Sequence, residues 1–216
     1  MNFSEFKSAS NRSDSLVNTK QHFFSSLFSN YVAFFLYKIG FSPNSVTFLF
    51  CITGLSSAFA FSIQSLLLGY LLWRLHIILD MADGDIARAT KKYSSSADGF
   101  DKVNHILINL AVIFSISYLS KVNLFQIYFL CASFLISYLF DRLYLKEKRK
   151  SVRNLSLTKI LIRNIAGFEG FLVSFILITV FQFHDILPFL FIVYSLSFLA
   201  MFFFKLVLWQ KNNEDI

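Results

Sequence analysis

Long apolar segments, each close to the length that crosses a lipid bilayer, constrain this chain more than any other feature. A transmembrane helix needs about 20 mostly apolar residues, and the chain holds six such segments in succession. They are residues 43–63, 66–88, 100–120, 123–144, 160–182 and 186–208. Only 15% of the residues are charged, against about 25% in soluble domains. The sequence therefore predicts an all-α integral membrane protein with six transmembrane helices.

The segments outside these spans have a different composition. Residues 1–21 are polar and predict an N-terminal tail, and residues 211–216 predict a polar C-terminal tail. Residues 22–39 are apolar but interrupted by Ser, Asn and Lys, which favours an amphipathic interfacial helix, with a short span as the alternative. Ser42-Pro43-Asn44 supplies a helix cap and a proline for the first turn. The six spans are expected to form one domain over residues 40–210.

Positive charges gather on one side of the predicted spans. Lys and Arg precede the first span, fill the links after the second and fourth, and follow the last, whereas Lys121 stands alone on the other side. The positive-inside rule places both termini and both long links in the cytoplasm, in a multi-pass cell (inner) membrane protein. Because topology accounts for the net charge of +7, no nucleic acid partner is expected. The basic link at 142–163 suits anionic lipid, or in part a phosphorylated substrate.

Two aspartates lie one helical turn apart in the second span. A carboxylate in hydrocarbon is costly, so Asp80 and Asp83 are candidate functional residues. With about 100° between successive residues, they share one stripe of the helix with Gly84, Ala87 and Arg88. The two small residues leave a trough for a bulky group, and the arginine can donate to a phosphate or carboxylate.

A second polar pair, Asp101 and His105, begins the third span. These residues are four apart and therefore lie on one helical face. A short polar link joins the second and third spans, so the two polar faces are expected to meet at the cytoplasmic end. Clustered carboxylates favour a bound divalent cation, with oxygen ligands suited to Mg²⁺, Mn²⁺ or Ca²⁺. Two such ions could serve a displacement at phosphorus; the alternative is a buried ion-pair network beside a small-residue packing seam.

The stretch resembles the signature of the CDP-alcohol phosphotransferase (CDP-alcohol phosphatidyltransferase) family. That signature is Asp, two residues, Asp-Gly, two residues, Ala-Arg, eight residues, Gly, three residues, Asp, three residues, Asp. The matching positions in this chain are Asp80, Asp83, Gly84, Ala87, Arg88 and Asp101. The segment from Pro43 to Thr47 is similar to the one that opens the family's first span. The chain departs from the signature at Ala97, in place of glycine, and at His105, in place of the fourth aspartate.

The resemblance implies a role for each matching residue. Asp80, Asp83, Asp101 and His105 are the expected ligands of a divalent metal, Mg²⁺ or Mn²⁺, as two ions. The expected nucleotide and donor contacts are Gly84, Ala87, Arg88, Asn44 and Thr47. His105 would be the catalytic base for the acceptor hydroxyl, since imidazole can accept a proton near neutral pH; a Mn²⁺ or Zn²⁺ ligand, or a mark of lost activity, are the alternatives.

The implied function is transfer of a substituted phosphate from a CDP-linked donor to an alcohol, with release of CMP, in phospholipid or related phospho-glycoconjugate synthesis. The donor could be CDP-diacylglycerol or a CDP-linked polar alcohol. Arg153 and Arg163 are candidates for holding a phosphorylated acceptor. Membrane lipid is the further expected partner, and a homodimer is left open. A catalytically impaired relative acting as a binding or assembly subunit is the alternative function; the nucleotide-sized trough argues against an ion-coupled transporter.

Several other polar residues lie within the spans. His76 could line the substrate chamber or make an interhelical contact. Arg74 lies to the side of the Asp80 stripe and could pair or extend toward the surface. Asp85 faces away from the stripe and is expected to be solvated or paired. Cys51 and Cys131 lack the paired spacing of a metal or redox site and are expected to be free thiols.

Overall fold

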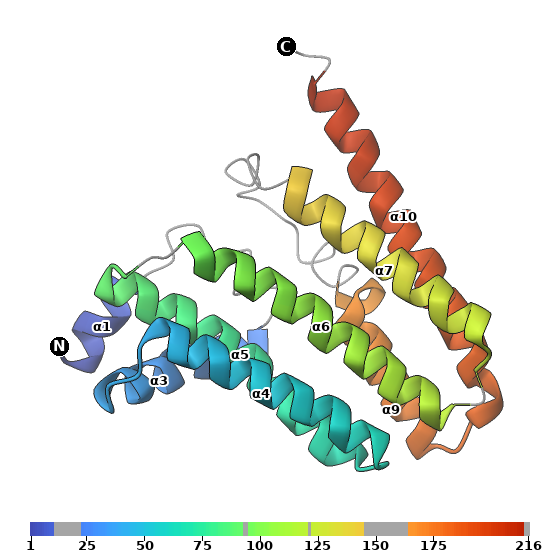
Figure 1. Ribbon diagram of the computed structural model, residues 1–216, viewed down its shortest axis with the longest axis horizontal. Helices are drawn as coiled ribbons and strands as arrows, with labels where there is room; N and C mark the ends of the chain where they lie inside the picture. The colour runs from blue at the N-terminus through green and yellow to red at the C-terminus, as the bar shows by residue number, and fades with distance from the viewer. Residues whose placement is uncertain (11–22, 93–94, 121, 145–163, 214–216) are drawn as a thin grey trace. The chain divides into compact units, whose positions relative to one another are not determined.

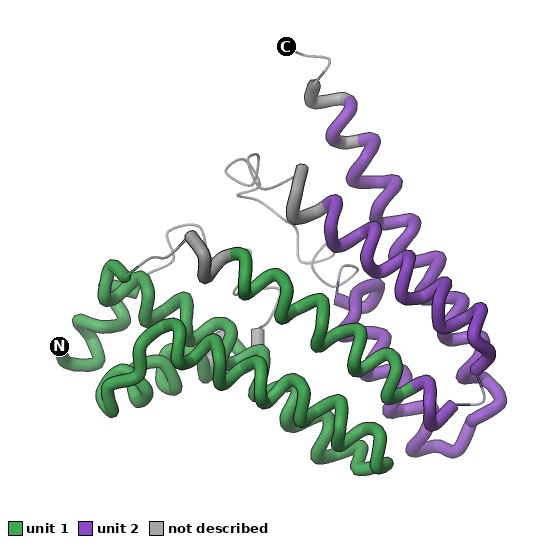
Figure 2. Tube along the Cα trace, viewed as in Figure 1, with its two compact units in different colours: residues 1–116 green, residues 117–216 purple. Residues whose placement is uncertain are grey.

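The computed structural model describes residues 1–10, 23–92, 95–120, 122–144 and 164–213. Every regular element in this part of the chain is a helix, which confirms the predicted all-α class (Figure 1). Internal packing divides the chain into two compact units, Met1–Ile116 and Ser117–Ile216 (Figure 2).

The helices follow the predicted spans closely. The first unit holds α1 (Phe3–Ala9), α3 (Phe23–Lys38), α4 (Pro43–Ser62), α5 (Leu66–Thr90) and most of α6 (Ser95–Leu119). The second unit holds α7 (Leu124–Tyr144), α9 (Phe168–Val180), a short 3₁₀ helix η2 (His184–Ile186) and α10 (Leu187–Asn213). Among the described residues, three segments are long and apolar enough to cross a membrane: Pro43–Ser62, Gly99–Leu119 and His184–Val207. The chain is therefore an integral membrane protein, and the count of six spans stays a prediction.

Helix α4 begins where the sequence predicts. The Ser42 side chain accepts a hydrogen bond from the Ser45 backbone N–H at 3.2 Å, and Pro43 occupies the first turn. This cap satisfies one of the N–H groups that the helix leaves without an intrahelical partner. The cap fixes the point at which α4 starts and hence the register of Thr47 one turn later.

Small residues let α4, α5 and α6 approach one another closely. Ser57 on α4 donates to the Gly69 carbonyl of α5 at 2.7 Å, and a Cβ on Gly69 would lie 2.8 Å from the Phe61 ring. A Cβ on Gly54 would likewise lie 2.6 Å from Cδ1 of Ile108 on α6. Close backbone approach at small residues is how helices associate in lipid, where hydrophobic burial gives little net gain. Gly54 therefore allows the close approach of α6 to α4, and Gly69 allows the close approach of α5 to α4.

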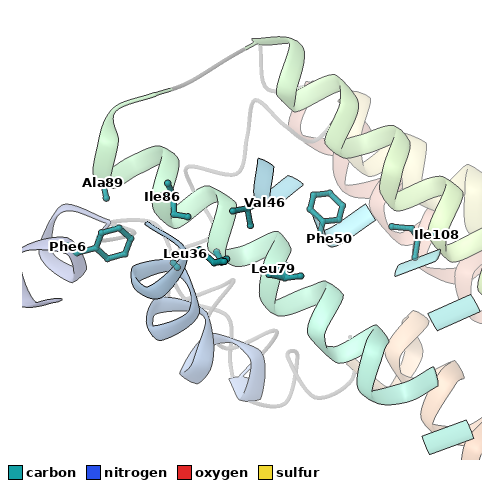
Figure 3. Packing of buried hydrophobic residues seen from close by; sticks show 10 residues of the cluster. Phe6, Leu36, Val46, Phe50, Leu79, Ile86, Ala89 and Ile108 are labelled. Atoms are coloured by element: carbon teal, nitrogen blue, oxygen red, sulfur yellow. The ribbon is translucent and has the colours of Figure 1, made fainter. Parts of the chain in front are cut away.

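The N-terminal segment, which its polar composition predicts to be a tail, contains helix α1. Helix α1 is capped by a reciprocal pair: Asn2 accepts from the Glu5 N–H and Glu5 accepts from the Asn2 N–H, each at 2.9 Å. Phe6 is fully buried in a core cluster that includes Leu36, Phe50 and Ile86 (Figure 3). Phe3 adds a second aromatic contact, since its ring stacks on the Tyr31 ring of α3 with centroids 5.0 Å apart. Two aromatic side chains therefore dock α1 in spite of the polar residues around them.

Helix α3 matches the bounds predicted for the interfacial helix. It buries Ser25, Ser29 and Ala33, while Phe28, Tyr31 and Phe35 are exposed. This arrangement places small side chains against α5 and aromatic side chains outward. An outward aromatic face suits contact with lipid, and the interfacial placement of this helix stays a prediction.

The fifth predicted span is interrupted within the described residues. Residues 164–166 are helical, Gly167 breaks the helix, and α9 starts at Phe168. The carbonyl groups at the break accept hydrogen bonds from α10, with Tyr194 donating to Ile165 at 2.9 Å and Ser197 donating to Ala166 at 3.0 Å. Irregular backbone at membrane depth is tolerated only where such partners satisfy it. The prediction of one continuous helix over 160–182 is therefore wrong at this point.

Replacing Gly54 by alanine should destabilise the first unit. The new methyl would collide with the fully buried Ile108, and overpacking of this kind costs about 1–3 kcal/mol. Unfolding of the purified protein in detergent would measure the change. Gly99→Ala is the matched control, because no atom lies within 4 Å of a Cβ built there. Equal stability of the two variants would contradict the close packing of α4 on α6.

Candidate functional site

Helices α5 and α6 bring three of the predicted ligands together. One ligand atom each from Asp80, Asp101 and His105 lie within 4.8 Å of one another. Nε2 of His105 is 3.1 Å from Oδ1 of Asp80 and 3.4 Å from Oδ1 of Asp101. The second and third spans thus meet through their polar faces, as their sequences predict.

The His105 ring is held between two aromatic neighbours. The Phe50 ring stacks on it with centroids 5.7 Å apart, and the His76 ring meets it edge-on at 5.6 Å. Nδ1 of His76 lies 3.1 Å from the Phe50 carbonyl oxygen; since a carbonyl only accepts, Nδ1 is the protonated nitrogen. His76 therefore makes the interhelical contact, and its ring also supports His105.

Asp83 lies outside this group of three and has a different partner. The Thr47 hydroxyl donates to Oδ2 of Asp83 at 2.7 Å and lies 3.1 Å from the Pro43 carbonyl oxygen. Thr47 is buried, so its hydroxyl positions a carboxylate within the first unit. Asn44 is exposed one turn earlier on α4. The contact between Thr47 and the donor stays a prediction; in the structure the Thr47 hydroxyl binds the Asp83 carboxylate.

The cluster suits a divalent metal. Within the part of the chain that the structure describes, Oδ1 of Asp101 is buried and has no hydrogen-bond partner. A buried carboxylate oxygen left in this way costs free energy unless a cation or a donor satisfies it. Mn²⁺ can bind both the two carboxylates and the imidazole, whereas Mg²⁺ would bind mainly the carboxylate oxygens.

Arg88 occupies the trough predicted beside Gly84. A Cβ on Gly84 would lie 3.2 Å from Nη1 of Arg88, so the arginine folds back over this glycine. Its Nη2 donates to Oδ1 of Asp85 at 2.6 Å, and its Nε donates to the Ser10 carbonyl oxygen at 3.1 Å. Asp85 is fully buried and also accepts from Ser29 on α3 at 3.3 Å. Of the two expectations for Asp85, the paired one is confirmed and the solvated one is wrong.

The remaining candidates divide into described and undescribed residues. Arg153 and Arg163 lie outside the described residues. Ala87 is half-buried on the same side of α5 as Gly84. Arg74 donates to the Tyr70 hydroxyl at 2.9 Å and lies over the Tyr70 and Trp73 rings. Both cysteines are free, as predicted.

The residues that hold Arg88 were not predicted from the sequence. Asn2-Phe3-Ser4-Glu5 carries a capping-box pattern that could have predicted α1. Nothing in the sequence alone pairs Ser29 with Asp85, because the two are 56 residues apart.

Comparison with known families supports the resemblance. The model of the CDP-alcohol phosphatidyltransferase family matches residues 41–195, and the chain belongs to this family. Members transfer a phosphatidyl group from a CDP-alcohol to an acceptor alcohol. Comparison with curated protein sequences gave no match.

Removing one carboxylate from the cluster should weaken metal binding. We expect Asp101→Asn to lower the affinity for Mn²⁺ at least tenfold, because a neutral amide oxygen replaces a charged ligand. Electron paramagnetic resonance of Mn²⁺ titrated into the purified protein measures this. Asp185→Asn is the control, since Asp185 is exposed in η2. Equal affinities of the two variants would exclude a metal site at this cluster.

Proposed function

We propose that this protein transfers a substituted phosphate from a CDP-linked donor to an alcohol hydroxyl and releases CMP, with a divalent metal as cofactor. The meeting of Asp80, Asp101 and His105 on two adjacent helices is the observation that carries the proposal. This arrangement gathers carboxylates and a proton acceptor beside Gly84 in a chain of the CDP-alcohol phosphatidyltransferase family.

The carboxylates would hold the metal. Asp80 and Asp101 offer oxygens within the cluster, and Asp83 keeps one oxygen free of Thr47. When bound, the metal supplies positive charge for the donor's diphosphate and for the oxygens that gain charge during the displacement. Thr47 contributes by fixing the direction in which the Asp83 carboxylate points.

Donor binding would use the end of α5 that carries Gly84, Ala87 and Arg88. Among the described residues, Nη1 of Arg88 has no hydrogen-bond partner, while Nε and Nη2 are engaged. An N–H group at this position can donate to a phosphate oxygen. Asn44 is exposed on the first turn of α4 and adds a second polar contact for the donor.

His105 would accept the proton of the attacking hydroxyl. If Nε2 donates to Asp80, a neutral ring has its lone pair on Nδ1, and no described residue hydrogen-bonds that atom. The alcohol oxygen forms a bond to the β-phosphorus, and the bond from that phosphorus to the bridging oxygen breaks. CMP leaves with the bridging oxygen, and the alcohol proton passes to Nδ1 of His105.

The setting of the reaction follows from the membrane helices and the charge distribution. We propose a cell (inner) membrane location with both termini and the site facing the cytoplasm, since Lys and Arg gather on that side. CDP-diacylglycerol with a polar acceptor, or a CDP-linked polar alcohol with a lipid or glycan acceptor, fits the same chemistry. Arg153 and Arg163 are proposed anchors for a phosphorylated acceptor.

Membranes that contain the protein should release CMP from a CDP-linked donor only when a divalent metal is present. Mass spectrometry of the products, with CDP-diacylglycerol and CDP-linked polar alcohols tested in parallel, identifies the transferred group. Asp83→Asn should lower the rate at least 100-fold, because it removes a negative charge that would help to hold the metal, while its amide oxygen can still accept the hydrogen bond from Thr47. Full activity of Asp83→Asn would refute the proposed mechanism.

Variants of His105 test the proposed base separately. His105→Ala should lower kcat about 10²–10⁴-fold, whereas His105→Asp should retain or raise activity by restoring the signature carboxylate. Activity that is indifferent to His105→Ala would end the base assignment. A wild-type protein that binds CDP but releases no CMP would favour the binding or assembly subunit.

A further inference from the structure

We propose that the N-terminal helix α1 belongs to the donor-binding site and acts by fixing the position of Arg88. This inference rests on the proposed function, since it assigns a role in binding the CDP-linked donor. Residues 1–10 precede the segment that matches the family model, which begins at residue 41. The contact of α1 with Arg88 therefore lies outside the matched segment.

Arg88 is held by protein groups on two sides. Nη2 donates to Oδ1 of Asp85 at 2.6 Å, within helix α5. Nε donates to the carbonyl oxygen of Ser10, the residue that ends α1, at 3.1 Å. A guanidinium presents its donors in a rigid plane, so two bonds to different atoms fix the orientation of that plane. The third nitrogen, Nη1, is then directed over Gly84.

The Ser10 carbonyl is itself fixed by the packing of α1. Ser10 is 2% exposed, and its N–H donates to the Phe6 carbonyl at 2.8 Å. The Phe6 ring packs against the rings of Phe34 and Tyr37 on α3, with centroids 5.6 and 5.4 Å away. Figure 3 shows Phe6 beside Ile86 and Ala89 at the same end of α5 as Arg88. Loss of the Phe6 ring would therefore release the acceptor of Nε.

Asp85 forms the second contact that holds Arg88 and supplies its counter-ion, so that Arg88 is not paired with Asp80 or Asp83. Its side chain is 1% exposed, and its second oxygen accepts from Ser29 on α3. Because Asp85 neutralises Arg88, the guanidinium does not need Asp80 or Asp83 as a counter-ion. Asp80 and Asp83 instead contact His105 and Thr47, and Nη1 of Arg88 can donate to an anion.

These contacts specify the ligand chemistry at Nη1. The Arg88 side chain is 30% exposed, so an outside group can reach it. Beside a cluster suited to a divalent cation, the matching anionic group is a phosphate of a nucleoside diphosphate. Helix α1 would thus order the long Arg88 side chain before the nucleotide binds. This lowers the entropic cost of binding and raises the affinity, although α1 itself does not contact the nucleotide.

Binding of CDP to the purified full-length protein in detergent, with Mg²⁺ present, tests the proposal. Arg88→Ala should raise the Kd for CDP about tenfold, the usual loss for one charge-assisted hydrogen bond. Phe6→Ala should raise it by a similar factor, and Phe6→Ala combined with Arg88→Ala should be no weaker than Arg88→Ala alone. Arg88→Lys should resemble Arg88→Ala, because lysine keeps the charge and loses the fork. In turnover assays, Phe6→Ala should raise KM for the donor and leave kcat unchanged.

Two controls separate this role from folding. Lys7→Ala removes an exposed side chain of α1 and should leave the Kd for CDP unchanged. Replacing both Asn2 and Glu5 by alanine removes only the exposed capping pair, and should weaken CDP binding with the unfolding temperature unchanged. Hydrogen exchange of residues 3–10 should also rise in Arg88→Ala, independently of nucleotide.

The possible results distinguish this inference from the proposed function. A wild-type protein that does not bind CDP overturns both. A wild-type protein that binds CDP, with Phe6→Ala and the capping variant within twofold of it, overturns the role of α1 alone. If the increase in the Kd for CDP in the double variant equals the product of the two single increases, the role of α1 is also overturned. Phe6 and Arg88 would then affect CDP binding independently.

Discussion

The charged side chains of helix α5 need hydrogen-bond partners, and the packing of the first unit depends on this requirement. Each charged group at its C-terminal end meets a different neighbour: Asp80 meets His105 on α6, Asp83 meets Thr47 on α4, Asp85 meets Ser29 on α3, and Arg88 meets Ser10 after α1. An unpaired charge in a protein interior or in hydrocarbon costs several kcal/mol or more. Helix α5, which carries three of the predicted site residues with charged side chains, is for that reason also the helix that the other helices of the unit contact.

Close packing and polar partnering support each other in this arrangement. Ile108 on α6 packs against Gly54 on α4. One turn earlier on each helix, His105 stacks against Phe50. The hydrogen bond from Ser57 to the Gly69 carbonyl joins α4 to α5 far from the charged end. The polar cluster thus lies at one end of α5, whereas Ser57 and Gly69 hold α4 and α5 together at the other end. Side chains positioned in this way need little reorganisation when a charged substrate binds.

Local signals in the sequence predicted much of the fold, and tertiary contacts account for what it did not predict. The Ser42 cap and the apolar lengths placed the helices to within a few residues, and helical spacing put Asp80 on one face with Asp83. Helix α1 was missed because one buried ring, Phe6, outweighs the polar composition around it. The break at Gly167 was missed because its stability comes from Tyr194 and Ser197, about 30 residues away. Hydrogen bonds between residues so far apart leave no periodic trace in the sequence.

The histidine at position 105 has a structural meaning beyond its departure from the signature. A fourth carboxylate there would face Asp80 and Asp101 with a third negative charge, and only bound cations would relieve the repulsion. An imidazole instead places its Nε2 atom 3.1 Å from an oxygen of Asp80 and 3.4 Å from an oxygen of Asp101. A neutral His105 therefore adds no third negative charge, and its Nε2 can hydrogen-bond Asp80. Because Nε2 of His105 lies within 3.4 Å of both carboxylates, a cation held by Asp80 and Asp101 would also affect the position of the His105 ring.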